Sequence, residues 1–162
     1  VILFFMPLYV HAMPGIVMEV IEQMQPAQRA GQSIGFVVQS GFLEAAQSDY
    51  LKAYFAMLAK RLGYVDLGCA VRGGAAGVCM QPEKASEALF AVLRKLGEGY
   101  RETGAFDGEA VSALGTPYRL TQKESRLLER LHRLKIGDLM WTFMLLRNKA
   151  FRLRRARPYT EE

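Results

Sequence analysis

The stretch Val1-Ile-Leu-Phe-Phe-Met-Pro-Leu-Tyr-Val-His-Ala-Met-Pro-Gly-Ile16 decides the fold class of this chain. A wholly apolar run ends at Pro7, a short loop follows, and Pro14-Gly15 opens an amphipathic segment. This order predicts a buried parallel strand that leads through a loop into a helix. A strand that is apolar on both faces needs neighbours on both sides. The stretch therefore predicts the C-terminal portion of a larger α/β domain.

Composition limits the class of protein. The chain has 162 residues, of which 51% are hydrophobic, so it is long enough for one packed domain with an appendage. Its longest apolar run is far shorter than the roughly 20 residues that a membrane span needs. Cys69 and Cys79 have no histidine neighbours, so they predict neither a metal site nor a disulfide framework. A reducing cytoplasm is the expected compartment.

The net charge of +5 is unevenly distributed. Residues 119–157 contain twelve Lys or Arg and three acidic residues, whereas residues 1–118 contain nine basic and eleven acidic residues. The positive charge therefore belongs to the C-terminal part. No nucleic-acid-binding motif accompanies it, and the sequence predicts no nucleic-acid partner.

Strands and helices alternate through the first hundred residues. Apolar segments predict strands over 1–6, 33–39 and 66–72, and helical spacing predicts helices over 14–25, 44–62 and 82–100. This order predicts a parallel sheet with right-handed crossovers. The residues expected on the inner helix faces are Ile16, Val17, Val20, Ile21 and Met24, then Leu51, Tyr54, Phe55, Leu58 and Leu62, then Ala88, Leu89, Val92 and Leu96.

The character of the sequence changes after Gly104. Residues 106–114 predict a short helix or turn. Thr121-Gln-Lys-Glu124 forms a capping box, so a new helix is expected to begin there and to end near residue 134. A last helix is expected over 138–156, with apolar residues on most of its sides.

Three loops follow the three predicted strands and are expected at one edge of the sheet, where ligands bind in open α/β sheets. The loop over 7–13 offers Tyr9 and His11, and the loop over 40–44 offers Phe42 and a glycine turn. The glycines after residue 72 allow a backbone to approach a ligand closely. Together these loops suit a flat heteroaromatic ligand.

Several of these segments carry a resemblance. "PLYVHAMPGIVMEVIEQ", "VVQSGFLEAAQ" and "LGCAVRGGAAGV" are similar to the third, fourth and fifth strands, with their loops, of the flavodoxin-like NAD(P)H-dependent FMN reductases. The ending Arg157-Pro158-Tyr159 is like a subgroup of that family with a C-terminal helical extension. The order and spacing of the motifs cover most of the chain.

The resemblance implies a flavodoxin-like three-layer sandwich over 1–117 and a basic helical extension over 118–162. It implies electron transfer from NAD(P)H through bound FMN to an acceptor. It assigns one side of the flavin ring to Pro7, Leu8, Tyr9, Val10 and His11, and the other side to Ser40, Gly41, Phe42 and Glu44.

The first two strands of the family pattern, with its phosphate loop, have no counterpart here. FMN binding by this chain is therefore expected to be weak or absent. The alternatives left open are a fragment or interaction module without cofactor, and a membrane-surface adaptor that uses the basic tail. A homodimer is a further option.

Overall fold

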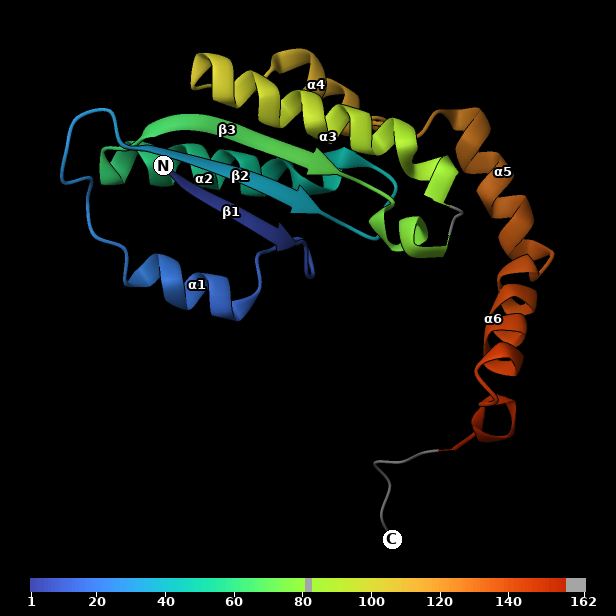
Figure 1. The fold of residues 1–162 in the computed structure, drawn as a ribbon. Coiled ribbons are helices and arrows are strands. Elements are labelled where there is room, and N and C mark those ends of the chain that lie inside the picture. Colours follow the sequence, from blue (N-terminus) through green and yellow to red (C-terminus); the bar gives the residue numbers. More distant parts are fainter. Residues whose placement is uncertain (81–82, 157–162) are drawn as a thin grey trace, which may run out of the picture. The chain divides into compact units, whose positions relative to one another are not determined.

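The computed structural model describes residues 1–80 and 83–156, and the chain divides into two compact units, Val1–Arg119 and Leu120–Glu162. The first unit is mixed α/β (Figure 1). Its elements are β1 (Ile2–Pro7), α1 (Gly15–Glu22), β2 (Ser33–Gln39), the short 3-10 helix η1 (Ala45–Ser48), α2 (Asp49–Leu62), β3 (Val65–Arg72), the 3-10 helix η2 (Ala75–Met80), α3 (Glu83–Thr103) and α4 (Gly108–Leu114).

The three strands form a parallel sheet in the order β1-β2-β3. The predicted parallel α/β architecture is thereby confirmed. Phe4 pairs with Phe36 across the first ladder, and Phe36 pairs with Cys69 across the second. A register shift between Ile34 and Phe36 interrupts the second ladder.

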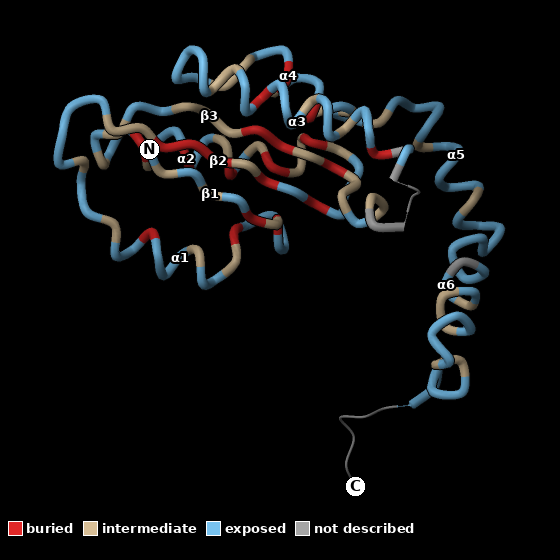
Figure 2. The backbone as a smooth tube through the Cα atoms, viewed as in Figure 1, coloured by how far each residue is buried: buried red, intermediate tan, exposed pale blue. Residues whose placement is uncertain are grey.

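One face of the sheet packs against α1 and α2. Phe36 is fully buried at its centre, stacked against Phe55 of α2 with ring centroids 3.8 Å apart and against Phe4 at 5.6 Å. Figure 2 shows the buried residues concentrated along the strands and on the inner sides of these helices. Helical spacing in α2 turns Leu51 and Phe55 inward together.

The opposite face packs against α3 and α4. Ala70 of β3 meets Leu96 of α3 and Leu114 of α4 in a smaller buried cluster. Gly35 of β2 belongs to this face, where a Cβ would lie 2.9 Å from the Phe106 ring. The residue has no room for a side chain, so Phe106 packs directly over the strand.

Strand β1 lies at an edge of the sheet. Its apolar sequence indicated a strand that needs neighbours on both sides in a larger sheet, and among the described residues it pairs with β2 alone. On the face shared with α3, the Leu3 side chain is 36% exposed and that of Phe5 is 72% exposed. The strand is apolar on both faces, yet within residues 1–80 and 83–156 one of those faces is largely exposed and one edge has no strand beside it.

Several helix predictions need correction. Ile16, Val20, Tyr54 and Ala88 are exposed, because the helices bury narrower stripes than the sequence periodicity indicated. Pro14 is the N-cap of α1 and precedes its first turn. The helix expected to begin at Glu44 opens as η1 and continues as α2, which ends at Gly63 in the left-handed conformation with φ of 74°.

The second unit contains α5 (Gln122–Arg133), α6 (Ile136–Arg147) and the 3-10 turn η3 (Phe151–Leu153). The capping box at Thr121 and Glu124 is confirmed, with both reciprocal hydrogen bonds present. The single helix expected over 138–156 is wrong, because the helical path stops at Asn148 and Lys149 takes a φ of 56°. The predicted end at Arg157-Pro158 lies outside the described residues.

Candidate functional site

The three strands of the first unit end side by side. Pro7 pairs with Gln39, and Gln39 pairs with Arg72, so the last residues of β1, β2 and β3 are in register. The loops that follow therefore leave the sheet at one edge, as the sequence predicted. The ladder continues one step further, where the Leu8 N–H donates to the Gln39 carbonyl over 2.7 Å.

The first loop is a tight two-residue hairpin. The N–H groups of Tyr9 and Ala12 each donate to the carbonyl of the other over 2.8 Å. Val10 and His11 between them have φ values of 46° and 61°, a conformation that β-branched residues rarely adopt. The turn displays Val10 in solvent, 90% exposed, and keeps the exposed Tyr9 side chain at the sheet edge.

The second loop is fixed to the third by backbone hydrogen bonds. The Ser40 carbonyl accepts from the Ala75 N–H over 2.9 Å, and the Phe42 carbonyl accepts from the Gly74 N–H over 2.7 Å. Ser40 is buried, and its Oγ donates to the Phe42 carbonyl over 3.1 Å. These bonds place the Gly41 turn at a fixed position beside the first loop.

The 3-10 helix η1 and the first residue of α2 are held by residues from the far end of this unit. The Ala45 and Ala46 N–H groups donate to the Pro117 and Tyr118 carbonyls over 3.1 and 3.0 Å. The Tyr118 hydroxyl donates to the Asp49 carboxylate, which lowers the pKa of that carboxyl below its usual value. The Ser40–Glu44 loop is thus anchored at both of its ends.

A shallow cavity of about 290 Å³ lies where the three loops meet. Five of the nine predicted site residues line it, joined by Gln39, Ala75 and Ala76. The five are Pro7, Leu8, Tyr9, Ser40 and Gly41. Leu8 and Ser40 are buried, so their side chains belong mainly to the core.

The other four predicted residues are placed differently. His11 and Phe42 stack with ring centroids 5.4 Å apart and an interplanar angle of 10°, which joins the first loop to the second. Val10 and Glu44 do not line the cavity. The Glu44 carboxylate accepts a hydrogen bond from the Gln47 amide over 3.4 Å. The structure therefore brings together the two loops, but not every side chain assigned to the ligand.

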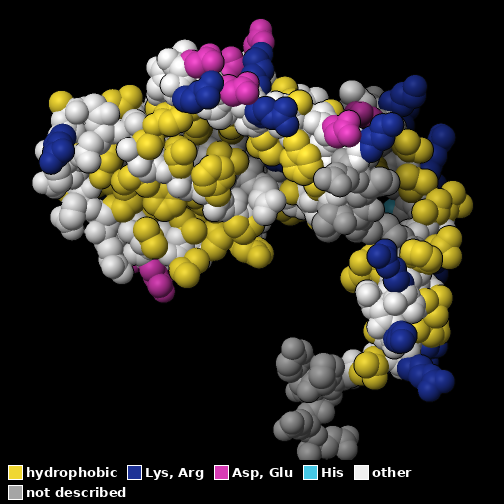
Figure 3. All heavy atoms as spheres, viewed as in Figure 1, with side chains coloured by type: hydrophobic (Ala, Val, Ile, Leu, Met, Phe, Trp, Pro, Cys, Tyr) yellow, Lys and Arg dark blue, Asp and Glu magenta, His cyan; other side chains and the backbone are white. Residues whose placement is uncertain are grey.

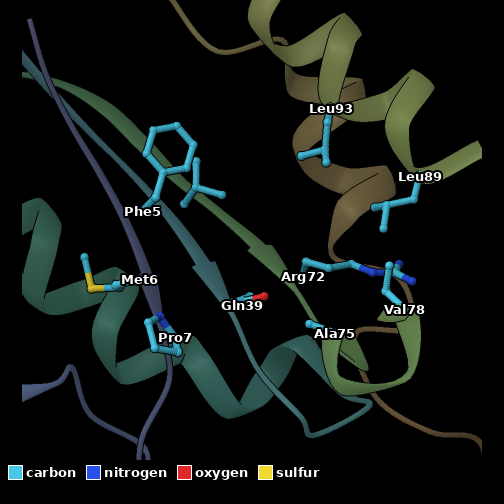
Figure 4. Close-up of a pocket in the computed structure, with 10 residues that line it drawn as sticks. Phe5, Met6, Pro7, Gln39, Arg72, Ala75, Val78, Leu89 and Leu93 are labelled. Atoms are coloured by element: carbon cyan, nitrogen blue, oxygen red, sulfur yellow. The ribbon is translucent and has the colours of Figure 1, made fainter. Parts of the chain in front are cut away.

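A second cavity of about 360 Å³ adjoins the first, since Pro7, Gln39 and Ala75 line both. Its walls are mostly apolar, with Phe5 on one side and Leu89 and Leu93 of α3 on the other (Figure 4). Arg72 extends into this region, and its buried Nε has no hydrogen-bond partner among the described residues. Arg72 was not among the predicted site residues, although a cation at the end of an apolar strand is a signal that the sequence contains.

The described residues offer this site neither a reactive thiolate at Cys69 nor a group of metal ligands. Burial raises the pKa of the Cys69 thiol to about 12, so it carries no thiolate at neutral pH. Residues 1–80 and 83–156 contain no group of three His, Cys, Asp or Glu side chains placed to hold a metal ion. The carboxyl edge of the sheet provides flat aromatic surface and backbone polar groups, and these suit the binding of a planar molecule.

No family model, curated protein or solved structure matches this chain. The functional interpretation therefore depends on the geometry of the site itself. Among the described helices, none is both long enough and apolar enough to cross a membrane.

Proposed function

We propose that this chain carries the ring-binding part of a flavodoxin-like NAD(P)H-dependent FMN oxidoreductase. The observation that supports this is the cavity formed by three loops at the carboxyl edge of a parallel sheet, with Tyr9 exposed beside the Gly41 turn. The strand order β1-β2-β3 is the order of the third to fifth strands in a flavodoxin-like sheet.

In this proposal FMN supplies the hydride chemistry when it is bound, and the protein supplies position and electrostatics. Tyr9 offers one flat face to the ring. Phe42 stacks on His11 and does not line the cavity, so it would have to turn towards the ring to cover the other face. The Gly41 N–H forms no hydrogen bond within the described residues, so it is free to donate to the edge of the ring that becomes negative on reduction.

Phosphate binding is the weak part of this arrangement. The described loops at the edge, residues 8–14, 40–44 and 73–80, contain one Ser or Thr hydroxyl, that of Ser40, which already donates to Phe42. Helix α1 begins with no side-chain cap at Pro14. An FMN phosphate would therefore find few of the donors that usually hold it at a helix N-terminus.

Titration of the chain with FMN tests the proposal. We expect saturable but weak binding, with a Kd of about 10 μM or higher, because ring contacts operate without strong phosphate contacts. Quenching of flavin fluorescence measures it. Riboflavin, which lacks the phosphate, is the matched control and should bind within about threefold of FMN.

Two results would contradict this proposal in different ways. Stoichiometric binding of FMN below about 1 μM would show that the phosphate is held by residues outside these three loops. No binding of either flavin at about 1 mM would remove the oxidoreductase proposal and favour an interaction module built on the same sheet.

Replacing Tyr9 by alanine is expected to weaken flavin binding by about 2–10-fold, the loss of one aromatic stacking contact. The control is Tyr100→Ala, because Tyr100 lies near the end of α3 and packs on Phe106. Parallel fluorescence titrations of the two variants measure the difference. Equal effects would mean that Tyr9 is an ordinary loop aromatic.

A further inference from the structure

The C-terminal unit, Leu120–Glu162, combines high positive charge with exposed apolar surface. Its described part, residues 120–156, contains ten Lys or Arg and three acidic residues. No residue of this part whose burial is described is buried. Figure 3 shows apolar side chains next to Lys and Arg along α5 and α6 on the face in view.

The apolar surface is centred on α6. Asp138 and Arg147 are the only charged residues of this helix, which is apolar on most of its sides. Leu139 is 70% exposed, Trp141 62% and Phe143 64%. A helix of this kind is stable only when another apolar phase covers it.

The cations lie at the two ends of the apolar helix. Arg130, Arg133 and Lys135 precede it, Arg147 is its last residue, and Lys149, Arg152, Arg154 and Arg155 follow it. Within residues 120–156 none of them forms a salt bridge. The guanidinium of Arg154 lies 4.1 Å from the centroid of the Phe151 ring. Unpaired charge on both sides of an apolar patch indicates an acidic partner that also has an apolar interior.

We propose that the C-terminal unit binds the surface of a membrane that contains anionic lipids, with α6 lying in the plane of the interface. Twelve residues of helix extend about 18 Å, which is less than the roughly 30 Å thickness of a bilayer core. An upright helix would also force one of its two cationic ends into hydrocarbon. Lying flat, both ends reach lipid headgroups while Leu139 and Phe143, four residues apart on one face of the helix, enter the acyl boundary.

The preceding helix supports the same orientation. Leu127, Leu128 and Leu131 form one stripe of α5, and Arg126 and Arg130 lie beside it. This strong separation of apolar and cationic residues is typical of helices that bind at an interface. A nucleic acid would pair with the cations but would leave the leucine stripe and α6 uncovered.

The single tryptophan of the chain, Trp141, belongs to α6 and reports on changes in the surroundings of this helix. Vesicles of phosphatidylcholine with about 30% phosphatidylserine should shift its emission to shorter wavelength and should sediment with the full chain. Vesicles of phosphatidylcholine alone should bind at least about tenfold more weakly. Added salt should release the chain from the anionic vesicles.

Two matched pairs of variants separate the contribution of the cations from that of the apolar side chains. Arg147→Gln with Lys149→Gln should lower sedimentation with anionic vesicles by at least about tenfold, whereas Lys60→Gln with Arg61→Gln on α2 should leave it unchanged. Phe143→Ser should weaken binding, and Tyr50→Ser, at an exposed position on α2, should not. All six positions are exposed, so circular dichroism should show an unchanged fold.

Three results would overturn the proposal. The first is no sedimentation with anionic vesicles. The second is equal binding to neutral and anionic vesicles, which would leave the cations without a role. The third is a Trp141 emission shift that depends on protein concentration in the absence of lipid, because it would assign α6 to a contact between copies of the chain. These three results do not depend on whether the chain binds flavin, so the membrane proposal and the flavin proposal can fail separately.

Discussion

Lysine at positions 3 and 5 is expected to convert an associating chain into a monomer. Leu3 and Phe5 lie on the exposed face of β1, and in the part of the chain that the structure describes β1 pairs with β2 alone. Residues 2–6 of this strand contain no charge and no proline, the usual features that prevent an edge strand from pairing with other chains. We therefore expect the unmodified chain to self-associate at tens of micromolar.

The size of this effect follows from the surface involved. Burial of a large apolar side chain contributes roughly 1.5–3 kcal/mol, and a twofold contact through β1 would bury four of them. The Leu3→Lys, Phe5→Lys double variant should then reduce the association constant by more than about a thousandfold. Light scattering during size-exclusion chromatography measures the mass of both proteins.

The control places the same substitutions on another exposed apolar surface of the first unit. Tyr50 and Met57 of α2 are exposed, and lysine at both should leave the association unchanged. A monomeric parent chain at these concentrations would show that the open face of β1 is already covered. Equal association of the two double variants would assign the contact to a different surface.

Alanine at position 73 should disrupt the carboxyl edge of the sheet. A Cβ on Gly73 would lie 2.9 Å from the Phe42 carbonyl oxygen and closer still to that of Leu43. Both obstacles are backbone atoms, so relief requires the Ser40–Glu44 loop to move. We expect a loss of about 3 kcal/mol of stability, at the upper end of overpacking effects, together with loss of flavin binding.

Gly41→Ala is the matched control for this prediction, since it belongs to the same pair of loops. A Cβ at Gly41 would meet only the Ala76 Cβ, at 3.9 Å, which is ordinary contact. Urea denaturation of both variants should show a large change for Gly73→Ala and a small one for Gly41→Ala. A Gly73→Ala protein of unchanged stability would mean that the two loops are not held together as described.

The strands could be predicted from the sequence because their apolar runs are continuous and end at turn residues. Ser33–Gln39 was predicted with its observed bounds. The helix faces were harder to predict, because Ile16, Val20 and Tyr54 fit the helical period although no element covers them. Periodicity describes a helix, whereas burial depends on what packs against it.

In the candidate site too, the positions of the loops could be predicted, whereas the positions of individual side chains could not. The order of parallel strands predicted that the three loops lie at one edge of the sheet, and this prediction did not depend on any side chain. The stacking of His11 on Phe42 and the position of Arg72 beside α3 depend on backbone turns and rotamers that no spacing encodes. Val10 was assigned to the ligand, but its positive φ directs it into solvent.

The register of the sheet also determines how the first unit folds. Phe4 pairs with a residue 32 positions later in the chain, and Phe36 pairs with one 33 positions later. No strand pair is local, so each ladder requires closure of a long loop before any pairing energy is gained. Helix α1, with eight residues, is too short to persist alone in water. We therefore expect α1 and the β1–β2 ladder to form in one cooperative event, at the rates of mixed α/β domains.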